Sequence, residues 1–318
     1  MTYKKMMKKG RQGLTRGEFL RAGGAWTLSM ALGDAFAGEA LADAPHDYAT
    51  LQREIDEVTP DDFADYLQGG CNGFCGLFKP PVFSRLDDAF DRVVRELRAC
   101  EVVEKPAVWL LYNMGIVVKT RESVFSVDLM HRKATELAPA LDFALITHNH
   151  RDHFTEDFYR VMNGAGRTVI SNFKDNYGVK DRAKDGGYTR QNKVFRIKDV
   201  EIRTSLTDHN PYLIDFTSVF EIRVGNFVIY HSGDCSNAAK LNPTARPDLW
   251  FVHPYNWMDV KDCVNRVKPV RTVIAHLNEL SHATGRARWT WEQGLKAQAA
   301  VREAGYEAIV PTWGERVL

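Results

Sequence analysis

The sequence predicts an α+β protein in which mixed β-sheets are covered by helices. The hydrophobic content of 44% and the charged content of 26% are typical of a soluble globular protein with a sizeable core. From residue 107 onward the chain changes to short β-branched runs, which predict strands. The early runs follow one another directly and the later ones alternate with helical stretches, so mixed sheets fit better than a single parallel sheet.

The overall charge argues against a general attraction to nucleic acid or anionic lipid. Forty-two Lys and Arg residues balance 41 Asp and Glu residues, which leaves a formal net charge of +1 on 318 residues. The sequence also contains no internal repeat of solenoid period and no glycine-rich phosphate loop. A small-molecule partner is therefore expected, with no nucleic acid and no transmembrane segment, and the oligomeric state stays open.

Residues 1–44 have the composition of an export signal. Basic residues run as far as Arg21, a mostly small and apolar stretch follows, and small residues surround Phe36 and Asp43. Residues 15–21 resemble the bacterial twin-arginine signal, with Gly17 in the place of the second arginine. The apolar part is too short to span a bilayer, so we expect a signal peptide and a periplasmic or otherwise exported protein. A disordered arm on a cytoplasmic protein is the alternative.

Residues 45–105 predict a helical N-terminal extension. Residues 46–68 are expected to be helical, with Thr59 as an N-cap before Pro60. Residues 85–100 carry apolar side chains three and four positions apart, which predicts a second helix with one buried face. Between the helices, Cys71 and Cys75 either form a small disulfide or lie in an ordinary loop, which we favour.

Residues 106–318 predict the main domain. Its strands are expected at 107–112, 115–119, 123–128, 143–147, 168–171, 194–204, 217–223, 226–231, 249–252, 272–275 and 307–310. Helices are expected between them at 154–163, 258–267 and 290–304.

Four potential metal ligands follow the predicted strand 143–147 within six residues. His148 and His150 are two apart in extended backbone, so both imidazoles leave on the same side and can share one metal. Asp152 and His153 lie at the turn into the next helix and can face a second metal. Packing does not easily account for four such residues together, and the segment therefore predicts a metal site.

This segment resembles the His-x-His-x-Asp-His hallmark of the metallo-β-lactamase superfamily, and further motifs of that family follow in order. The resemblance covers about residues 107–311 and implies an αββα sandwich, the metallo-β-lactamase fold, here with an N-terminal helical extension. It implies a binuclear metal site whose ligands are His148, His150, Asp152, His153, His209, Asp234 and His276. Asp128 is either a residue that orients a ligand imidazole or an ordinary cap at the end of a strand.

The resemblance also implies a mechanism. Two divalent ions would lower the pKa of a shared water and polarise a carbonyl or phosphoryl oxygen. Asp152 and Asp234 are the expected catalytic residues, since they reduce the repulsion between the ions and orient the hydroxide. The nitrogen and oxygen ligands suit zinc, with iron or manganese left open.

Within the superfamily, residues 107–120 resemble the opening hairpin of the ascorbate-6-phosphate lactonase-like and phospholipase D-like branch. That branch usually has Trp-Leu-Gly-His-Ala here, and Tyr112 and Asn113 stand near its histidine. Candidate substrate contacts are Tyr112, His253, Tyr255, Asn278 and Arg286. His253 is equally compatible with a structural role, and His231 is expected to support the Asp234 loop. His282, Arg286 and Arg288 lie in a polar loop after His276, where they could hold a carboxylate or phosphate, although a solvated loop is favoured.

The sequence therefore predicts a hydrolase in which a metal-bridging hydroxide attacks a small ester, lactone or phosphodiester. One alternative is a nuclease of the same fold, which the absent basic excess disfavours. Another is a metal-binding protein without turnover, because such a protein can keep the same ligands.

Overall fold

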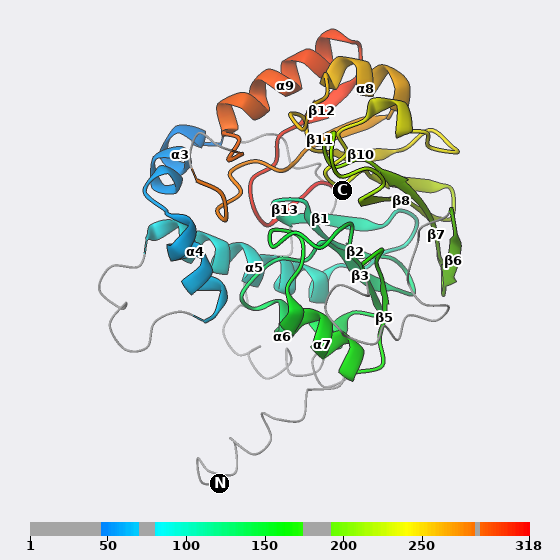
Figure 1. Cartoon of the computed structure of the whole chain (residues 1–318). Helices are drawn as coiled ribbons and strands as arrows, with labels where there is room; N and C mark the ends of the chain where they lie inside the picture. The colour runs from blue at the N-terminus through cyan, green and yellow to red at the C-terminus, as the bar shows by residue number, and fades with distance from the viewer. Residues whose placement is uncertain (1–45, 70–79, 174–191, 284–286) are drawn as a thin grey trace, which may run out of the picture.

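The computed structural model describes residues 46–69, 80–173, 192–283 and 287–318. Two β-sheets lie face to face, with helices α5, α6 and α7 outside one sheet and α8 and α9 outside the other (Figure 1). The predicted αββα fold with helices before the main domain is therefore confirmed. The predicted export signal, Cys71, Cys75 and Arg286 lie outside the described residues.

The first sheet has six strands in the order β13-β1-β2-β3-β4-β5. The early strands pair antiparallel as a meander, whereas β3, β4 and β5 are parallel. The strands are β1 (Ala107–Tyr112), β2 (Gly115–Lys119), β3 (Val124–Val127), β4 (Phe143–Leu145), β5 (Thr168–Ile170) and β13 (Glu315–Arg316).

The second sheet has seven strands in the order β12-β11-β10-β9-β8-β7-β6. Strands β6 to β9 pair antiparallel, and β9, β10, β11 and β12 are parallel. The strands are β6 (Val194–Ile197), β7 (Val200–Thr207), β8 (Thr217–Val224), β9 (Phe227–His231), β10 (Leu249–Val252), β11 (Arg271–Ile274) and β12 (Glu307–Ile309).

Alternating side chains of the strands enter two separate cores. Val108 and Leu110 of β1 pack between the sheets against residues such as Phe220 and Phe251, whereas Trp109 and Leu111 of the same strand pack under the helices. Both faces of each sheet are thus buried, which explains why the strands are apolar runs rather than alternating ones.

The helices of the main domain cover the outer faces. They are α6 (Ala134–Leu137), α7 (Glu156–Gly164), α8 (Val260–Val267) and α9 (Trp291–Glu303), with short 3-10 turns η3 (Ala138–Ala140) and η5 (Ala238–Lys240). A capping box between Thr290 and Gln293 begins α9, and Asp259 caps α8. Helices α8 and α9 therefore begin at side chains that accept hydrogen bonds from free backbone N–H groups.

The N-terminal extension forms three helices, α3 (Tyr48–Asp56), α4 (Pro60–Leu67) and α5 (Pro81–Ala99). Thr59 and Asp62 form a capping box, so the predicted N-cap divides residues 46–68 into two helices. Leu86, Phe90 and the other apolar residues of α5 that face the sheet are buried in the core that also contains Trp109 of β1. The helices are thus packed into the main domain.

Three elements differ from the predictions. The expected strand 194–204 is a hairpin of β6 and β7, because Lys198 adopts a positive φ of 53° and turns the chain. The short strand β13 and helix α6 were not predicted, since two and four residues carry no recognisable periodicity. No helix among the described residues is long and apolar enough to cross a membrane.

Candidate metal centre

The candidate ligands meet where parallel strands end. His148 follows β4, and Asp234 and His276 follow β9 and β11. Parallel strands have their carboxyl ends at one edge of a sheet, so β9 and β11 bring Asp234 and His276 together. The end of β4 in the other sheet lies beside them, which brings together residues more than a hundred positions apart. All seven candidate ligands fall into two clusters in which potential ligand atoms lie within 4.8 Å of one another.

The first cluster, here the three-histidine group, consists of His148, His150 and His209. Their ring centroids lie 4.6 Å (His148 to His150), 4.4 Å (His150 to His209) and 5.0 Å (His148 to His209) apart. His148 is buried, whereas His150 and His209 are partly exposed. Phe216 packs against all three rings, so the group has one apolar wall and one open side.

The second cluster, here the carboxylate-histidine group, consists of Asp152, His153, Asp234 and His276. Asp152 Oδ2 lies 3.3 Å from His153 Nε2 and 3.2 Å from His276 Nε2. All four residues are buried, with at most 5% of any of them exposed. This group therefore places two carboxylates and two imidazoles in a space with little access to water.

Asp234 lies between the two groups. Its Oδ1 is 3.2 Å from His153 Nε2, and its Oδ2 is 3.5 Å from His209 Nε2 and 3.8 Å from His148 Nε2. The Oδ2 atom also lies 3.3 Å from His276 Nε2. The carboxylate thus presents oxygens to both clusters, as a bridging ligand must.

The backbone at the centre is held in unusual conformations. Asp128, His276 and Asn278 have φ angles of 44°, 57° and 51°, in the left-handed region. Such conformations cost about 1–3 kcal/mol each and persist where surrounding contacts fix them. Gly233 also has a positive φ, and a Cβ there would lie 2.8 Å from Thr217 Cγ2, so only glycine fits before Asp234.

Burial keeps His148 and His150 of the three-histidine group neutral. It lowers the pKa of His148 well below the usual value. Burial and the neighbouring His209 lower the pKa of His150 to about 4. A neutral imidazole nitrogen is free to bind a metal at neutral pH.

In the carboxylate-histidine group, the effect of neighbouring charges on the pKa values of His276 and Asp234 exceeds the effect of burial. Burial lowers the pKa of His276, but the carboxylates of Asp234 and Asp152 outweigh it and raise that pKa to about 10. Burial raises the pKa of Asp234, but His153 and His276 outweigh it and hold that pKa well below the usual value. The carboxylates therefore favour positive charge between these residues, which a bound cation would supply.

The donor atoms fit a metal ion. The Nε2 atoms of His148 and His209 are buried and make no hydrogen bond with any described residue. A buried ring nitrogen without a partner is costly in an otherwise satisfied interior. A metal ion at the centre would provide that partner, and the mixture of imidazole nitrogen and carboxylate oxygen is typical of zinc or iron sites.

Further residues orient the ligands. Asp128 Oδ2 lies 2.9 Å from His153 Nδ1 and also accepts a 2.7 Å hydrogen bond from Thr147 Oγ1. Asp128 thus both caps the end of β4 and fixes the ring of His153, so the two roles left open by the sequence occur together. Asn113 Nδ2 donates to the carbonyl oxygen of Asp152 at 3.1 Å, which ties the β1–β2 turn to the centre.

The structure corrects two of the predicted substrate contacts. Tyr112 is 1% exposed, and its hydroxyl donates to Glu279 Oε1 and accepts from the Leu280 N–H. Asn278 is fully buried and accepts a hydrogen bond from Gln52. Both side chains stabilise the loop after His276 and offer no surface to a substrate.

Two further predicted contacts, His253 and Tyr255, are engaged by neighbouring residues. His253 is buried and stacks on His276 with a centroid distance of 4.0 Å. Tyr255 is half-buried, and its hydroxyl donates to the Gln293 carbonyl oxygen. His231 bonds to the Met114 carbonyl oxygen at 2.9 Å, so it links β9 to the first hairpin rather than bonding to the Asp234 loop.

The sequence analysis did not predict the burial of two residues around the centre. Glu279 is fully buried, accepts from Ser281 Oγ at 2.9 Å and pairs with His282 Nδ1. Arg288 is 3% exposed and donates to the carbonyl oxygens of Ile55, Val58, Glu279 and Leu280. The expectation of a solvated loop is wrong for Arg288, which no sequence pattern marked as buried.

The fold and the two clusters define a class of protein, αββα sandwiches that bind metal at the sheet edge. A family model described as the beta-lactamase superfamily domain matches residues 116–275, half of the chain, and the chain belongs to this superfamily. A search of curated proteins finds no match.

Solved structures share the fold at low sequence identity. The metallo-beta-lactamase fold protein YhfI from Bacillus subtilis is 14% identical over 67% of this chain and 99% of its own, with a TM-score of 0.51. An isothiocyanate hydrolase from Delia radicum gut bacteria is 14% identical over 67% of this chain and 98% of its own, with a TM-score of 0.50. CmlA, a diiron beta-hydroxylase from Streptomyces venezuelae, is 13% identical over 72% of this chain and 58% of its own, also with a TM-score of 0.50. These likenesses concern the fold alone.

Proposed function

We propose that the protein is a divalent-metal-dependent hydrolase acting on a small ester, lactone or phosphodiester. The observation that carries the proposal is the place of Asp234, whose two carboxylate oxygens face the three-histidine group on one side and His153 on the other. In this proposal the three-histidine group holds one ion, the carboxylate-histidine group holds the other, and Asp234 contacts both.

Two divalent ions, which we propose to be zinc, would lower the pKa of a shared water and polarise the electrophilic oxygen of the substrate. Asp152 and Asp234 would reduce the mutual repulsion of the cations and accept a hydrogen bond from the attacking water, which orients it. The partly exposed side of His150 and His209 is where the substrate would approach, because the other group is enclosed.

His282 is the residue we assign to the leaving group. Its Nδ1 is held by Glu279, and this hydrogen bond raises the pKa of the imidazole. The side chain remains 36% exposed, and one of its ring nitrogens lies within 4.8 Å of a carboxylate oxygen of Glu279 and of Asp152. In this proposal the imidazole of His282 holds a proton beside the centre and passes it to the oxygen that leaves.

The lactonase-like and phospholipase D-like branch stays our proposal for the position within the superfamily. It rests on the β1–β2 hairpin, where Asn113 occupies the neighbourhood of that branch's histidine and contacts Asp152. The same fold occurs in the diiron beta-hydroxylase CmlA, so identifying the metal is part of the test.

The test is metal analysis and a substrate panel on the same sample of the full chain. The panel contains lactones, aryl esters, phosphodiesters, thioesters and oligonucleotides, and the Asp152→Asn variant is assayed beside an Asp215→Asn control. Asp215 is 56% exposed, belongs to neither cluster and pairs with Lys240. We expect metal-dependent turnover that Asp152→Asn removes and Asp215→Asn keeps. Turnover by both variants, or bound metal without turnover of any substrate, would contradict the proposal.

We also propose that residues 1–44 direct export, in agreement with their basic and then small apolar composition. Fusion of this segment to a reporter that is active only outside the cytoplasm tests the proposal, with Arg16→Gln as the variant expected to lose export. A reporter that stays inactive with the native segment would favour a cytoplasmic arm.

A further inference from the structure

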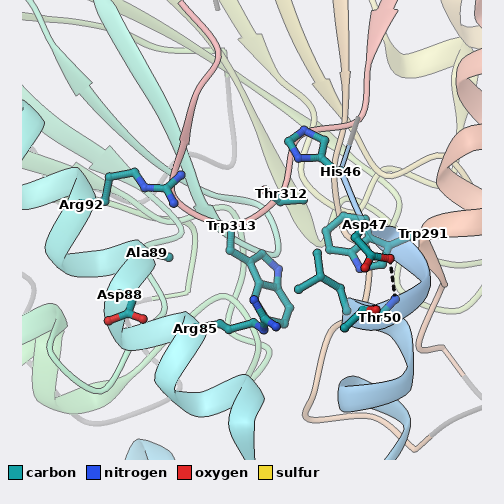
Figure 2. A pocket seen from close by; sticks show the side chains of 11 residues that line it. His46, Asp47, Thr50, Arg85, Asp88, Ala89, Arg92, Trp291, Thr312 and Trp313 are labelled. Atoms are coloured by element: carbon teal, nitrogen blue, oxygen red, sulfur yellow. Dashed lines mark hydrogen bonds between the residues drawn. The ribbon is translucent and has the colours of Figure 1, made fainter. Parts of the chain in front are cut away.

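A cavity of about 390 Å³ lies between α3, α5, the beginning of α9 and the chain that follows β12 (Figure 2). Its lining carries charges of both signs, including Asp47, Asp88 and Arg92. Asp47 accepts a hydrogen bond from the Thr50 N–H, and none of the seven candidate ligands lines the cavity. This cavity therefore indicates no single class of ligand, unlike the surface beside the three-histidine group.

Large apolar side chains are exposed beside the three-histidine group. Tyr212, Ile214 and Trp257, here the apolar rim, are 90%, 58% and 73% exposed. They are three of the four most exposed large apolar side chains in the part of the chain that the structure describes. Single exposed apolar residues are common, whereas groups of them are typical of binding surfaces. A group of this kind next to a candidate metal centre is therefore expected to contact a ligand.

Two residues of the rim belong to the segment that forms one wall of the three-histidine group. Tyr212 lies in a turn that begins at the candidate ligand His209, and its N–H donates to Asn210 Oδ1 at 2.8 Å. Ile214 lies between this turn and Phe216, whose ring packs against all three histidines. The turn and the packed ring thus hold both apolar side chains next to the partly exposed members of the group.

Trp257 comes from a second segment, which is bonded to the same ligand. Asn256 Nδ2 donates to the carbonyl oxygens of His209 at 2.8 Å and of Asp234 at 2.6 Å. Trp257 follows directly, with a φ of 61° in the left-handed region and its side chain in solvent. A bulky residue adopts this conformation only where neighbouring contacts hold it. The two bonds of Asn256 therefore fix the backbone of Trp257 relative to the centre.

The charged groups next to the rim are paired with one another. Lys240 Nζ lies 2.5 Å from Asp208 Oδ1 and 2.6 Å from Asp215 Oδ1. Residues 210–216 and 254–258 contain no Lys or Arg, so neither segment offers a cation to an anionic substituent of a substrate. An uncharged apolar group therefore fits this surface better than a carboxylate or a phosphate.

We propose that the substrate of the metal centre carries an alkyl chain attached to the group that reacts, and that this chain packs on Tyr212, Ile214 and Trp257. This role of the rim rests on the proposed hydrolase function, in which the substrate approaches the partly exposed side of His150 and His209. Burial of apolar surface between the chain and the rim supplies the additional binding free energy. The substrate class thus narrows to compounds with a chain of several carbons.

The test compares acetohydroxamate and hexanohydroxamate as ligands of the metal-loaded full chain. Both bind a metal ion through the same group, so the ratio of their affinities reports the contribution of the chain. A fully buried methylene strengthens binding about fourfold, and the longer chain on this open rim should bind at least about tenfold more tightly. Isothermal titration calorimetry measures both affinities without turnover. The indole N–H signal of Trp257 in NMR spectra, assigned with Trp257→Asn, should shift with hexanohydroxamate only.

Variants of the rim have a matched control. Tyr212→Ser and Trp257→Asn remove apolar surface, and asparagine tolerates the positive φ at the second position. Each should lower the affinity ratio at least about threefold. Val103→Ser removes a 79% exposed side chain that precedes β1, whereas the opposite end of β1 leads to Asn113 and the centre, so the ratio should stay unchanged. Equal ratios in the native protein and both rim variants would overturn the role of the rim.

Further outcomes separate the rim from the hydrolase function. Chain-dependent binding without turnover of any substrate in the panel would support the rim and contradict the hydrolase function. Turnover together with equal affinity for the two hydroxamates would keep the hydrolase function and overturn the role of the rim. If the native protein binds phosphatidylcholine vesicles, both rim variants do not, and the hydroxamates bind equally, the rim contacts a membrane instead of a substrate chain. Failure of both hydroxamates to bind would contradict the two proposals together.

Discussion

The two halves of the candidate metal centre differ in both enclosure and charge. The three-histidine group has two partly exposed members and no carboxylate of its own, and burial lowers the pKa values of His148 and His150. The carboxylate-histidine group is buried throughout, and its carboxylates raise the pKa values of His153 and His276. The three-histidine group is therefore suited to exchanging ligands, and the carboxylate-histidine group is suited to retaining a cation.

This difference indicates that the two groups have different roles within one site. A buried cation position with two carboxylates costs much desolvation unless a positive charge is present, so it stabilises whatever cation it holds. The three-histidine group, with two partly exposed members, can bind an ion and still admit a substrate atom. Asp234 joins the two halves, and loss of its charge should therefore have the largest effect.

Asp234→Asn should reduce hydrolysis by a factor on the order of 10³ or more, because the shared charge that holds the cations and orients the water is removed. Asn keeps the shape of the side chain, so the strand-rich circular dichroism spectrum should not change. Turnover and metal content measured on the same sample check this expectation. Near-normal turnover would show that Asp234 merely ends a turn after Gly233.

Replacing one histidine in each half should separate the two metal positions. We expect the fully loaded protein to carry two ions per chain, and both His276→Ala and His209→Ala should lower the count toward one. The ion that remains in His209→Ala should resist a chelator longer, because the carboxylate-histidine group is intact in that variant. Chelator competition followed by metal analysis makes the comparison. Two ions retained in His276→Ala would remove that residue from the site.

Asp128→Asn should weaken metal binding by about 10- to 100-fold, the range found when a group that orients a metal-binding histidine is lost. Asparagine can still accept from the Thr147 N–H, but it cannot also accept from both Thr147 Oγ1 and the His153 ring. The control is Asp199→Asn, whose carboxylate bonds to Thr120 and Ser123 at a distance from the centre. Equal metal affinities of the two variants, measured by competition, would leave Asp128 with a capping role only.

The sequence predicted the parts of the centre that lie within one short segment or follow a strand. His148 to His153 form a continuous motif, and Asp234 and His276 each follow an apolar run, so strand ends locate them. Glu279 and Arg288 carry no such signal. Arg288 donates across more than two hundred residues to the carbonyl oxygens of Ile55 in α3 and of Val58 just after it, contacts that no local pattern reveals.

The sequence likewise predicted the strands of the fold but not every contact between distant segments. The apolar runs predicted both sheets, because strands buried on two faces are continuous in hydrophobic residues. The role of the N-terminal extension was not predicted from its sequence, since an amphipathic helix reveals that one face is buried but not against what. Gln52 bonds to Asn278, and Arg288 bonds to the end of α3, so the extension supports the loop that follows His276.

The smallest expected effect concerns the metal-free protein, in which the two halves should give stability opposite dependences on pH. His150 has a folded pKa of about 4, below its unfolded value, so the unfolded chain binds more protons and stability should fall as pH decreases from about 6.5 toward 4. His276 has a folded pKa of about 10, so its contribution is complete below about 6.5 and is lost as pH rises toward 10.

Stability of the metal-free protein should therefore be greatest near neutral pH, and single variants can assign each limb of the profile. His150→Gln should make the acidic limb alone less steep and His276→Gln the alkaline limb alone, while His148 and His153 still contribute to the two limbs. Thermal unfolding in the presence of a chelator measures both, and each kcal/mol corresponds to a shift of about 2–4 °C in Tm for a domain of this size. If His276→Gln leaves the alkaline limb unchanged, the carboxylates of that half do not hold a proton on His276, and the electrostatic contrast between the two halves is wrong.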